Sequence, residues 1–445
     1  MYKAYITQLK DVRPHPNADR LVLGTCFGNT VCLDSSAVEG EIGIYFPEGG
    51  QLSLEFCEHN NLLRKKDEQG NNIGGYLDPD KRNIKTINLR GEKSDGLFLP
   101  LSSLVYTGAN LDELNIGDII TVLNGHEICT KYIPKVKSNN NYKTNKGRKK
   151  KINIAPLFAE HVDTEQLAYN INQFKVGDII DITLKMHGTS GRVGYLPIFK
   201  GYQDTRFCKI KNKFGHLFNK NYEDKHNGKP IYEYDYVTGT RRVVLDNNDN
   251  GGFYGNNDFR YQHTEKLKGK LYKNETIYFE IVGYVNESTP IMPSANNKKV
   301  NDKQFVKQYG NQTIFSYGCQ PGESEMYVYR MTMTNEDGDV VEYTPEYMRY
   351  RCEQMGIKCV PHFETKILTE KDNIKELAEK YYDGSDPIGK THIREGVVCR
   401  IVNRPKFTAY KHKSPNFRIL SGVAIEQMEK DHNIELISND ILSEV

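Results

Sequence analysis

The sequence lacks a long apolar run, closely spaced cysteines and a strong net charge. No stretch of about 18 apolar residues occurs and the start MYKAYITQLKDVRPHP has no signal-peptide core, so we expect a soluble cytoplasmic protein without a membrane partner. The 9 cysteines are never spaced CxxC, which favours neither a zinc knuckle nor a disulfide framework. The formal net charge is only +2, so a nucleic-acid surface would require a local basic cluster.

The length and the pattern of the first part of the chain indicate more than one domain. The 445 residues exceed a single hydrophobic core, and we expect two domains. Over residues 1–128, short apolar-alternating runs such as RLVLGTCF, EIGIYFPEGG and GLFLPL are separated by turn signals. Short strands at this spacing favour an all-β barrel or sandwich.

A basic segment follows this region. Residues 129–155 are predicted to be a flexible linker, and its centre KYIPKVKSNNNYKTNKGRKKK holds nine Lys or Arg residues and no acid. One interpretation is a solvated tether that only separates two domains. The alternative adds contact with phosphates, because lysines in such a segment can neutralise backbone charge.

The remainder, residues 156–445, alternates strand-like and helix-like runs. VGDIIDITLKM, TIYFEIVGY, MYVYRMTM, KCVPHFE, GVVCRIV and KFTAYKHK predict strands, whereas TEKLKGKL, TPEYMRYRCEQM and EKDNIKELAEKYY predict helices. We therefore expect an α+β domain with mostly antiparallel sheets. The segment 246–258, rich in Asn and Gly, is a loop that either touches substrate or is an ordinary insertion.

One lysine stands where a predicted strand meets a glycine turn. Lys185 begins the run Lys-Met-His-Gly-Thr-Ser directly after DIIDITL. A lysine amine with its ordinary pKa of about 10.4 is protonated at neutral pH, so it acts as a nucleophile only near cations or after desolvation. Alternation on the strand AYKHK places Lys411 and Lys413 on one face, where they can supply that positive charge and bind phosphates.

Two predicted strands each carry a glutamate beside glycine. Glu280 lies in IYFEIVGY and Glu395 in REGVVCRI. A carboxylate on a buried strand is costly unless it is paired or bound to a metal ion. Taken singly, each is more often a hydrogen-bonded structural acid, and only their joint spacing with the lysines favours a site.

The whole set resembles the motifs of a known superfamily. Over about 160–420, the order of motifs is similar to that of the covalent nucleotidyltransferases, which include RNA ligases, DNA ligases and mRNA capping enzymes. The matching residues are Lys185, His187, Gly188, Thr240, Arg241, Glu280, Tyr329, Glu395, Gly396, Lys411 and Lys413. HGTS, the upstream segment FAEHVDTEQL and YKHKSPNF most resemble Deinococcus-type RNA ligases with an N-terminal OB domain. The fold so implied is an ATP-grasp-like ligase domain.

The resemblance implies roles for these residues. Lys185 would attack the α-phosphate of ATP and form lysyl-AMP, AMP would pass to an RNA 5'-phosphate, and a 3'-hydroxyl would then displace it. Arg241 would hold ribose or the RNA phosphate, Glu280 ribose or a metal-bound water, and Glu395 the hydration shell of Mg2+ or Mn2+. Tyr329 would stack on adenine, with Tyr327 as the alternative. The family's usual aspartate is His187 here.

The first region carries a second resemblance. VRPHPNADRLVLGT followed by LRGEKSDGLFLPL is similar to OB folds that bind tRNA in synthetase-associated proteins. This implies an OB-like barrel that binds nucleic acid over 1–128. His15, Pro16 and Asp19 are open to a simpler explanation, in which they shape a turn between strands.

The sequence therefore predicts an ATP-dependent RNA ligase for nick sealing or RNA repair, with no obligate protein partner. A DNA ligase or a capping-type enzyme shares the motifs, and a non-catalytic RNA-binding protein is the alternative from another class. A phage-encoded role is one expectation for its source. The P-loop pattern GSDPIGKT, residues 384–391, is set aside because a helix precedes it and a strand follows, the reverse of a P-loop's context.

Overall fold

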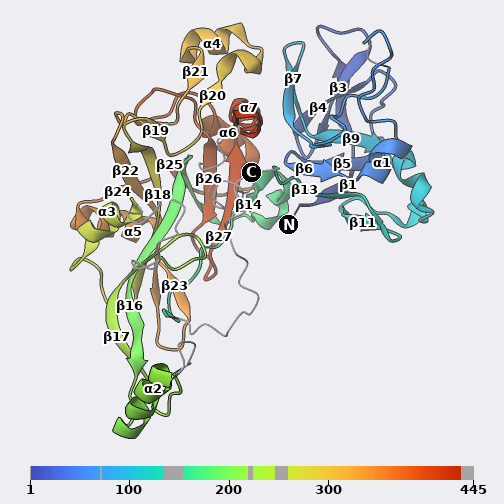
Figure 1. The fold of residues 1–445 in the computed structure, drawn as a ribbon. Coiled ribbons are helices and arrows are strands. Elements are labelled where there is room, and N and C mark those ends of the chain that lie inside the picture. The colour runs from blue at the N-terminus through green and yellow to red at the C-terminus, as the bar shows by residue number, and fades with distance from the viewer. Residues whose placement is uncertain (1, 71–72, 135–153, 219–223, 246–258, 432–445) are drawn as a thin grey trace.

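A computed structural model describes residues 2–70, 73–134, 154–218, 224–245 and 259–431 (Figure 1). The predicted loop 246–258 and most of the predicted linker lie outside the described residues. Residues 2–134 form an N-terminal part and residues 154–431 a C-terminal part, which lie side by side. Over these ranges, no helix combines the length and apolarity needed to cross a membrane.

The N-terminal part consists mainly of short antiparallel strands, as predicted. Its largest sheet has the order β10-β1-β5-β9, and a second has the order β2-β3-β4. Among the described residues these strands form several small sheets, without one closed barrel. The elements are β1 (Ala4–Gln8), β2 (Lys10–Pro14), β3 (Leu21–Cys26), β4 (Asn29–Asp34), β5 (Ile42–Phe46), β6 (Gly50–Leu52), α1 (Leu54–His59), β7 (Thr86–Leu89), β8 (Glu92–Asp95), β9 (Leu97–Pro100), β10 (Ile119–Ile120), β11 (Val122–Leu123), β12 (His126–Glu127) and β13 (Cys129–Lys131).

The start of the predicted linker is part of this β structure. β13 pairs antiparallel with β6, with Cys129 opposite Leu52 and Lys131 opposite Gly50. Cys129 is buried in the N-terminal core, which fixes the strand. Lys131 is therefore held on an ordered strand at the edge of the N-terminal part, where the sequence predicted a flexible segment.

The C-terminal part contains two large sheets, which confirms the α+β expectation. One sheet has the order β14-β27-β26-β15-β25 and the other β17-β16-β18-β22-β23. Within the described residues of these sheets, the β14–β27 and β22–β24 pairs are parallel and the other pairs are antiparallel. The strands are β14 (Glu165–Gln166), β15 (Ile179–Lys185), β16 (Thr189–Tyr202), β17 (Pro230–Gly239), β18 (Glu275–Asn286), β19 (Thr289–Pro290), β20 (Ala295–Asn296), β21 (Gln312–Thr313), β22 (Ser324–Thr334), β23 (Val340–Glu342), β24 (Lys358–Cys359), β25 (His362–Ile367), β26 (Gly396–Ile401) and β27 (Thr408–Lys413).

Two predicted helices form with the caps that their sequences favour. α5 (Pro345–Met355) starts at Thr344, whose hydroxyl accepts from the backbone N–H of Tyr347, and α6 (Ile374–Tyr382) starts at Asn373. The predicted helix over 264–271 is wrong. A short helix, α3 (Arg260–Thr264), ends there in a single 3-10 turn, because Gly269 has a φ of +79° that breaks the helical backbone.

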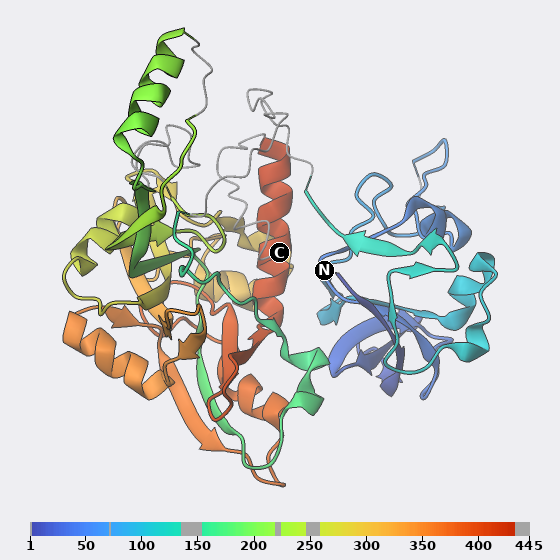
Figure 2. The ribbon, with the colours of Figure 1, turned by 90° about the horizontal axis from the view of Figure 1, so that it is seen from below.

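The largest hydrophobic core packs the β16–β18–β22 strands against α5 and reaches Leu184 on β15. α6 covers the other face of the five-stranded sheet, where Ile374 and Ala378 belong to one buried hydrophobic cluster with Ile180 and Val397. The last helix, α7 (Pro415–Asp431), lies in the seam between the two parts (Figure 2). Its Arg418 pairs with Asp95 of the N-terminal part.

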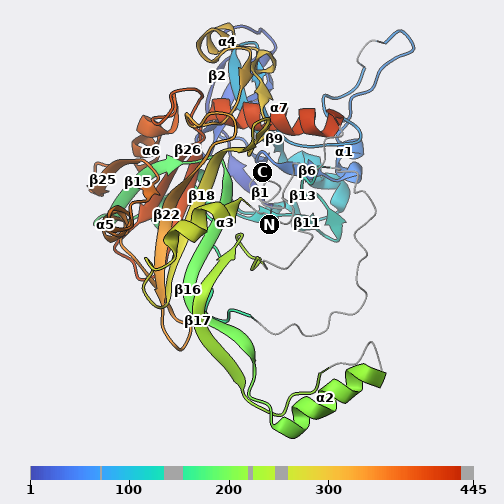
Figure 3. The ribbon, with the colours of Figure 1, turned by 60° about the vertical axis from the view of Figure 1, so that its left-hand side comes forward.

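A long hairpin projects from the C-terminal part. β16 and β17 pair over ten registers and carry α2 (Arg206–Phe218) at their tip (Figure 3). Phe207, Phe214 and Phe218 are exposed on this helix at 78%, 58% and 83%. The hairpin therefore presents an aromatic and basic helix far from the core of the molecule.

We predict that His263 makes stability depend on pH. Burial lowers the pKa of His263 to about 4 from its ordinary value of 6.5. The unfolded chain therefore binds one proton more than the folded protein between these values, so stability is fully present above pH 6.5 and falls towards pH 4. The His263→Gln variant is expected to lose this dependence, a slope of up to about 1.4 kcal/mol per pH unit.

Urea unfolding at a series of pH values measures this slope. His216→Gln is the control, because that side chain is half exposed on α2. An equal pH dependence in the wild type and in His263→Gln would contradict the prediction.

Candidate active site

Lys185 is the last residue of β15, between the two sheets. It lies opposite Gly396 on β26, and no side chain fits at that position because a Cβ there would be 2.1 Å from the carbonyl oxygen of His412. Gly188 follows the lysine, and its Cβ would be 2.3 Å from the carbonyl oxygen of Ile281. The two glycines thus let β15, β18 and β27 approach closely around the lysine.

Glu395 is the centre of a buried charge cluster. Its Oε1 lies 3.0 Å from the Nζ of Lys185 and 3.4 Å from the Nζ of Lys413. Its Oε2 lies 3.6 Å from the Nδ1 of His187. The glutamate side chain is fully buried and the two lysine side chains are 12% and 8% exposed, so these pairs are only weakly screened by water.

A second group of polar side chains surrounds Glu280. The Ser190 hydroxyl donates to the Glu280 carboxylate at 2.8 Å, and the Nε of Arg241 donates to the Ser190 oxygen at 3.3 Å. The sequence predicted Glu280 and Arg241 but assigned no role to Ser190. The sequence carries no local signal for this contact, because it arises from the β16–β18 pairing, in which Ser190 is directly opposite Glu280.

An apolar pocket lies beside Lys185. Its walls include Lys185, Ser190, Arg241, Glu280, Tyr329, Met348, Val360 and Phe407. The Tyr329 hydroxyl is 3.1 Å from the Nδ1 of His161, and burial raises the pKa of Tyr329 above its ordinary value, so the phenol stays protonated. Tyr327 is packed in the main core instead, which favours Tyr329 as the aromatic residue of this pocket. His161, which the sequence did not single out, belongs to the same wall.

Lys411 and Lys413 lie on the same face of β27, as the alternation predicted. Both line a cavity in the seam between the two parts of the chain. Lys131 lines the same cavity from β13. Burial lowers the pKa of Lys131, and the neighbouring cations Lys413 and Arg241 lower it further. Lys131 is thus close to the charge cluster, which its position in the predicted linker did not indicate.

His187 is held by aromatic side chains as well as by Glu395. Its ring makes edge contacts with Phe315 and Phe417, at centroid distances of 4.6 Å and 4.8 Å. Its backbone N–H donates to the Tyr317 hydroxyl at 2.7 Å. The ring is therefore fixed in one orientation towards the glutamate.

The P-loop-like segment has a structural explanation. It lies between α6 and β26, so a helix directly precedes it where a P-loop needs a strand. Asp386 is fully buried and accepts hydrogen bonds from the backbone N–H groups of Ile388, Gly389 and Thr391. These bonds use the loop's amides internally, which excludes a phosphate cradle at this position.

The carboxylates Glu280 and Glu395 provide oxygen ligands of the kind that Mg2+ and Mn2+ bind. Among the described residues, no group of three or more His, Cys, Asp or Glu side chains is arranged to hold an ion. These residues fit an ion that takes its other ligands from phosphate oxygens and water. Such ligation is usual for magnesium beside nucleotides.

The fold is similar to that of a solved RNA ligase. No protein-family model matches the chain, and no curated protein matches it. Solved structures of Naegleria gruberi RNA ligase do: a variant with ATP and Mn is 17% identical with a TM-score of 0.55, covering 93% of this chain and 98% of that one. A variant with AMP and Mn has 18% identity, a TM-score of 0.54 and coverages of 93% and 97%. The enzyme with PPi is 19% identical with a TM-score of 0.54, and the match covers 92% of this chain and 96% of that one.

We predict that Glu395→Gln destabilises the protein by about 3 kcal/mol, because it leaves the ammonium groups of Lys185 and Lys413 in a buried site without their carboxylate. Lys413→Met should lower the free energy of unfolding much less in the Glu395→Gln variant than in the wild type. Urea unfolding of the single and double variants measures this coupling. Glu364→Gln is the control, since its Lys380 partner is exposed and such a pair contributes under about 1 kcal/mol. Strict additivity of Glu395→Gln and Lys413→Met would contradict the prediction.

Proposed function

We propose that this protein is an ATP-dependent RNA ligase. The observation that carries the proposal is the buried Lys185–Glu395–Lys413 cluster beside an apolar pocket with an aromatic wall. It occurs on a fold shared with an RNA ligase whose structures were solved with ATP, AMP, PPi and Mn. A nucleophilic lysine next to a base-sized pocket and a set of cations is suited to nucleotidyl transfer.

In the first step, the Nζ of Lys185 attacks the α-phosphorus of ATP. An N–P bond forms, the bond from that phosphorus to the bridging oxygen breaks, and the electron pair leaves with pyrophosphate while the amine loses a proton to solvent. Lys411 and Lys413 bind the phosphate oxygens and offset the charge that develops on them. Glu395, 3.0 Å from the amine, orients Lys185 before the attack.

The adenosine occupies the apolar pocket in this proposal. Tyr329 stacks on adenine, while Glu280 and Arg241, joined through Ser190, hold the ribose. Gly188 and His187 form the turn after the nucleophile. AMP then passes to an RNA 5'-phosphate, and a 3'-hydroxyl displaces AMP to join the strands at a nick.

A divalent ion completes the proposed site. Glu280 and Glu395 would bind Mg2+ or Mn2+, directly or through water. When bound, the ion would offset negative charge on the phosphates. Lys411 and Lys413 would offset negative charge on the phosphates in the same way.

The finer assignments are proposed on the sequence resemblance. They are a Deinococcus-type RNA ligase active in repair. A cytoplasmic location is proposed separately, on the lack of a long apolar run in the sequence. The proposed organisation is an OB-like domain over 1–128, a linker over 129–155 and an adenylyltransferase domain over 156–445. The short antiparallel strands of the N-terminal part support an OB-like nucleic-acid-binding role.

The α2 hairpin supports RNA as the partner. The helix RFCKIKNKFGHLF contains Arg206, Lys209, Lys211 and Lys213 and no acidic residue. A basic helix neutralises phosphates, and exposed aromatic side chains such as Phe207 and Phe214 offer stacking surfaces. We propose that this helix contacts the RNA duplex at a distance from the reacting ends.

A DNA ligase or a GTP-using capping enzyme is the second candidate, since the cluster alone is compatible with either. Substrate tests distinguish these enzymes. Labelling with ATP and not GTP, together with sealing of RNA and not DNA 3'-ends, is the expected result for the proposed activity.

We predict that Lys185 is the site of covalent labelling. Wild-type protein incubated with α-labelled ATP and Mg2+ or Mn2+ should retain the label through denaturing electrophoresis, whereas Lys185→Ala should retain none. Lys200→Ala, which removes an exposed lysine on the hairpin, should label like the wild type. If the wild type labels with neither ATP nor GTP, the catalytic proposal fails and the RNA-binding alternative replaces it.

We also predict that charge on α2 affects RNA binding and not adenylylation. A variant with Lys209, Lys211 and Lys213 changed to Glu should bind a nicked RNA duplex more weakly and reduce the slope of log K against log salt by about 3. Labelling of Lys185 should stay unchanged. The control reverses the exposed Lys298 and Lys299, which lie just after β20. In Figure 1, β20 and α2 lie at opposite ends of the C-terminal part. Equal RNA affinity of the α2 variant and the wild type would exclude α2 as a contact.

A further inference from the structure

A buried tyrosine contacts the turn that follows the proposed nucleophile. Tyr317 lies between β21 and β22 and is 2% exposed. Its hydroxyl oxygen accepts a hydrogen bond from the backbone N–H of His187 at 2.7 Å. His187 stands in the turn that joins β15, which ends at Lys185, to β16. This hydrogen bond joins two residues that are 130 positions apart, and it fixes the backbone close to the nucleophile.

The backbone of Tyr317 is in turn held by His392. The N–H of Tyr317 donates to the Nε2 of His392 at 3.3 Å, and the Nδ1 of His392 lies 2.8 Å from the carbonyl oxygen of Ile393. Because a carbonyl oxygen only accepts, Nδ1 carries the proton and Nε2 is the acceptor. Burial lowers the pKa of His392, so the ring stays neutral and keeps both hydrogen bonds. The two aromatic rings also meet edge to face, with centroids 4.4 Å apart.

The P-loop-like segment supports this arrangement. It ends directly before His392, and Asp386 binds its backbone amides. A Cβ at Gly389 of this segment would lie 2.3 Å from the nitrogen of Gly318 and 2.6 Å from the carbonyl carbon of Tyr317. No side chain fits at such distances, so this close approach requires a glycine. The segment therefore packs directly against the backbone that carries the Tyr317 phenol.

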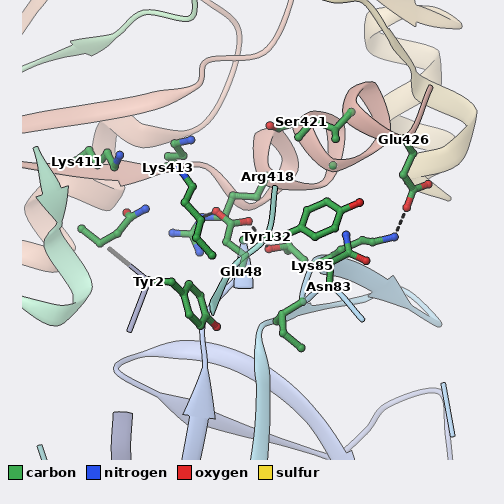
Figure 4. Close-up of a pocket in the computed structure, with 17 residues that line it drawn as sticks. Tyr2, Glu48, Asn83, Lys85, Tyr132, Lys411, Lys413, Arg418, Ser421 and Glu426 are labelled. Atoms are coloured by element: carbon green, nitrogen blue, oxygen red, sulfur yellow. Dashed lines mark hydrogen bonds and ion pairs between the residues drawn. The ribbon is translucent and has the colours of Figure 1, made fainter. Parts of the chain in front are cut away.

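The ring of His187 is held separately, by packing. Phe315 and Phe417 make the edge contacts with this ring that are described above. Phe417 is fully buried in the first turn of α7, whereas its neighbour Arg418 lines the seam cavity (Figure 4). Loss of the phenol oxygen would therefore release the backbone of the turn and leave the packing of the ring intact.

We propose that Tyr317 is a positioning residue for adenylylation, which fixes the turn after Lys185 so that the amine reaches the α-phosphorus of ATP. This inference rests on the proposed ligase activity and deepens it. Among the described residues, those that line the apolar pocket do not include Tyr317, so its loss affects the rate of attack and not the binding of ATP. The effect on rate is large because a misplacement of about 1 Å costs about a hundredfold.

The test removes the phenol oxygen alone, with Tyr317→Phe in the full-length protein. Tyr343→Phe is the matched control, since Tyr343 is also buried in the main core and its hydroxyl donates to Glu275 at 3.1 Å. Rate constants for the labelling of Lys185 are measured in single-turnover reactions over a range of α-labelled ATP concentrations. Sealing of a pre-adenylylated nicked RNA is measured on the same proteins, because a 3'-hydroxyl is the nucleophile in that reaction.

Tyr317→Phe is expected to lower the labelling rate constant at saturating ATP about tenfold, because the turn loses one hydrogen bond and keeps its aromatic contacts. The KM for ATP should equal that of the wild type, and sealing of the pre-adenylylated RNA should fall less than labelling does. Tyr343→Phe should label at the wild-type rate. Equal losses in labelling and sealing, or a wild-type labelling rate in Tyr317→Phe, overturn the proposal. If Tyr317→Phe does not fold, Gly389→Ala, which displaces the Tyr317 loop through Gly318, must show the same split between labelling and sealing.

Hydrogen exchange separates this inference from the ligase activity. It is measured by mass spectrometry on the unliganded proteins, with fragmentation that resolves the His187 amide. That amide should exchange about tenfold faster in Tyr317→Phe than in the wild type or in Tyr343→Phe, because it loses its acceptor. If the wild type labels with no nucleotide, the ligase proposal fails, and exchange still decides whether Tyr317 holds the turn. Normal labelling with equal exchange of this amide in all three proteins sinks the role of Tyr317 alone.

Discussion

The Glu395 carboxylate is the interaction on which the rest of the site depends. It is fully buried and lies within 3.6 Å of Lys185, Lys413 and His187. Two ammonium groups this close, with little water to screen them, would repel strongly without it. Gly396 lets the ends of β15, β26 and β27 approach closely. This approach also places the Glu395 carboxylate where it offsets the charges of the two lysines.

The sequence predicted those parts of the fold in which local pattern and tertiary packing agree. The alternating runs became β15, β18, β22, β26 and β27, and the Thr344 and Asn373 caps began their helices. It failed at 264–271, where helix-forming residues surround a glycine in the left-handed region. It also missed the strand Cys129–Lys131, because three residues of a basic segment pair with a distant strand.

The sequence predicted individual residues of the candidate site, but it did not predict the contacts between residues that are far apart in the chain. Alternation correctly placed Lys411 and Lys413 together, since it operates within one strand. Contacts between distant residues gave no local signal: Ser190 bonds Glu280 90 positions away, and Lys131 approaches Lys413 from the other part of the chain. The β18–β22 pairing has a register shift between Tyr278 and Phe279, next to Tyr329, which periodicity cannot reveal.

A short stretch of chain, from Lys413 to Arg418, connects the Glu395 charge cluster with the seam between the two parts. Lys413 ends β27, and the backbone N–H of Ser414 donates to the Glu395 carbonyl oxygen at 2.8 Å before α7 begins at Pro415. Arg418, one turn into that helix, pairs with Asp95 of the N-terminal part. The contact of Arg418 with the N-terminal part is therefore one helical turn from Ser414, which adjoins Lys413 and is bonded to Glu395 at the centre of the site. Lys131 belongs to the same N-terminal part and lines one cavity with Lys413, so the contact between the two parts also sets how close these two cations lie.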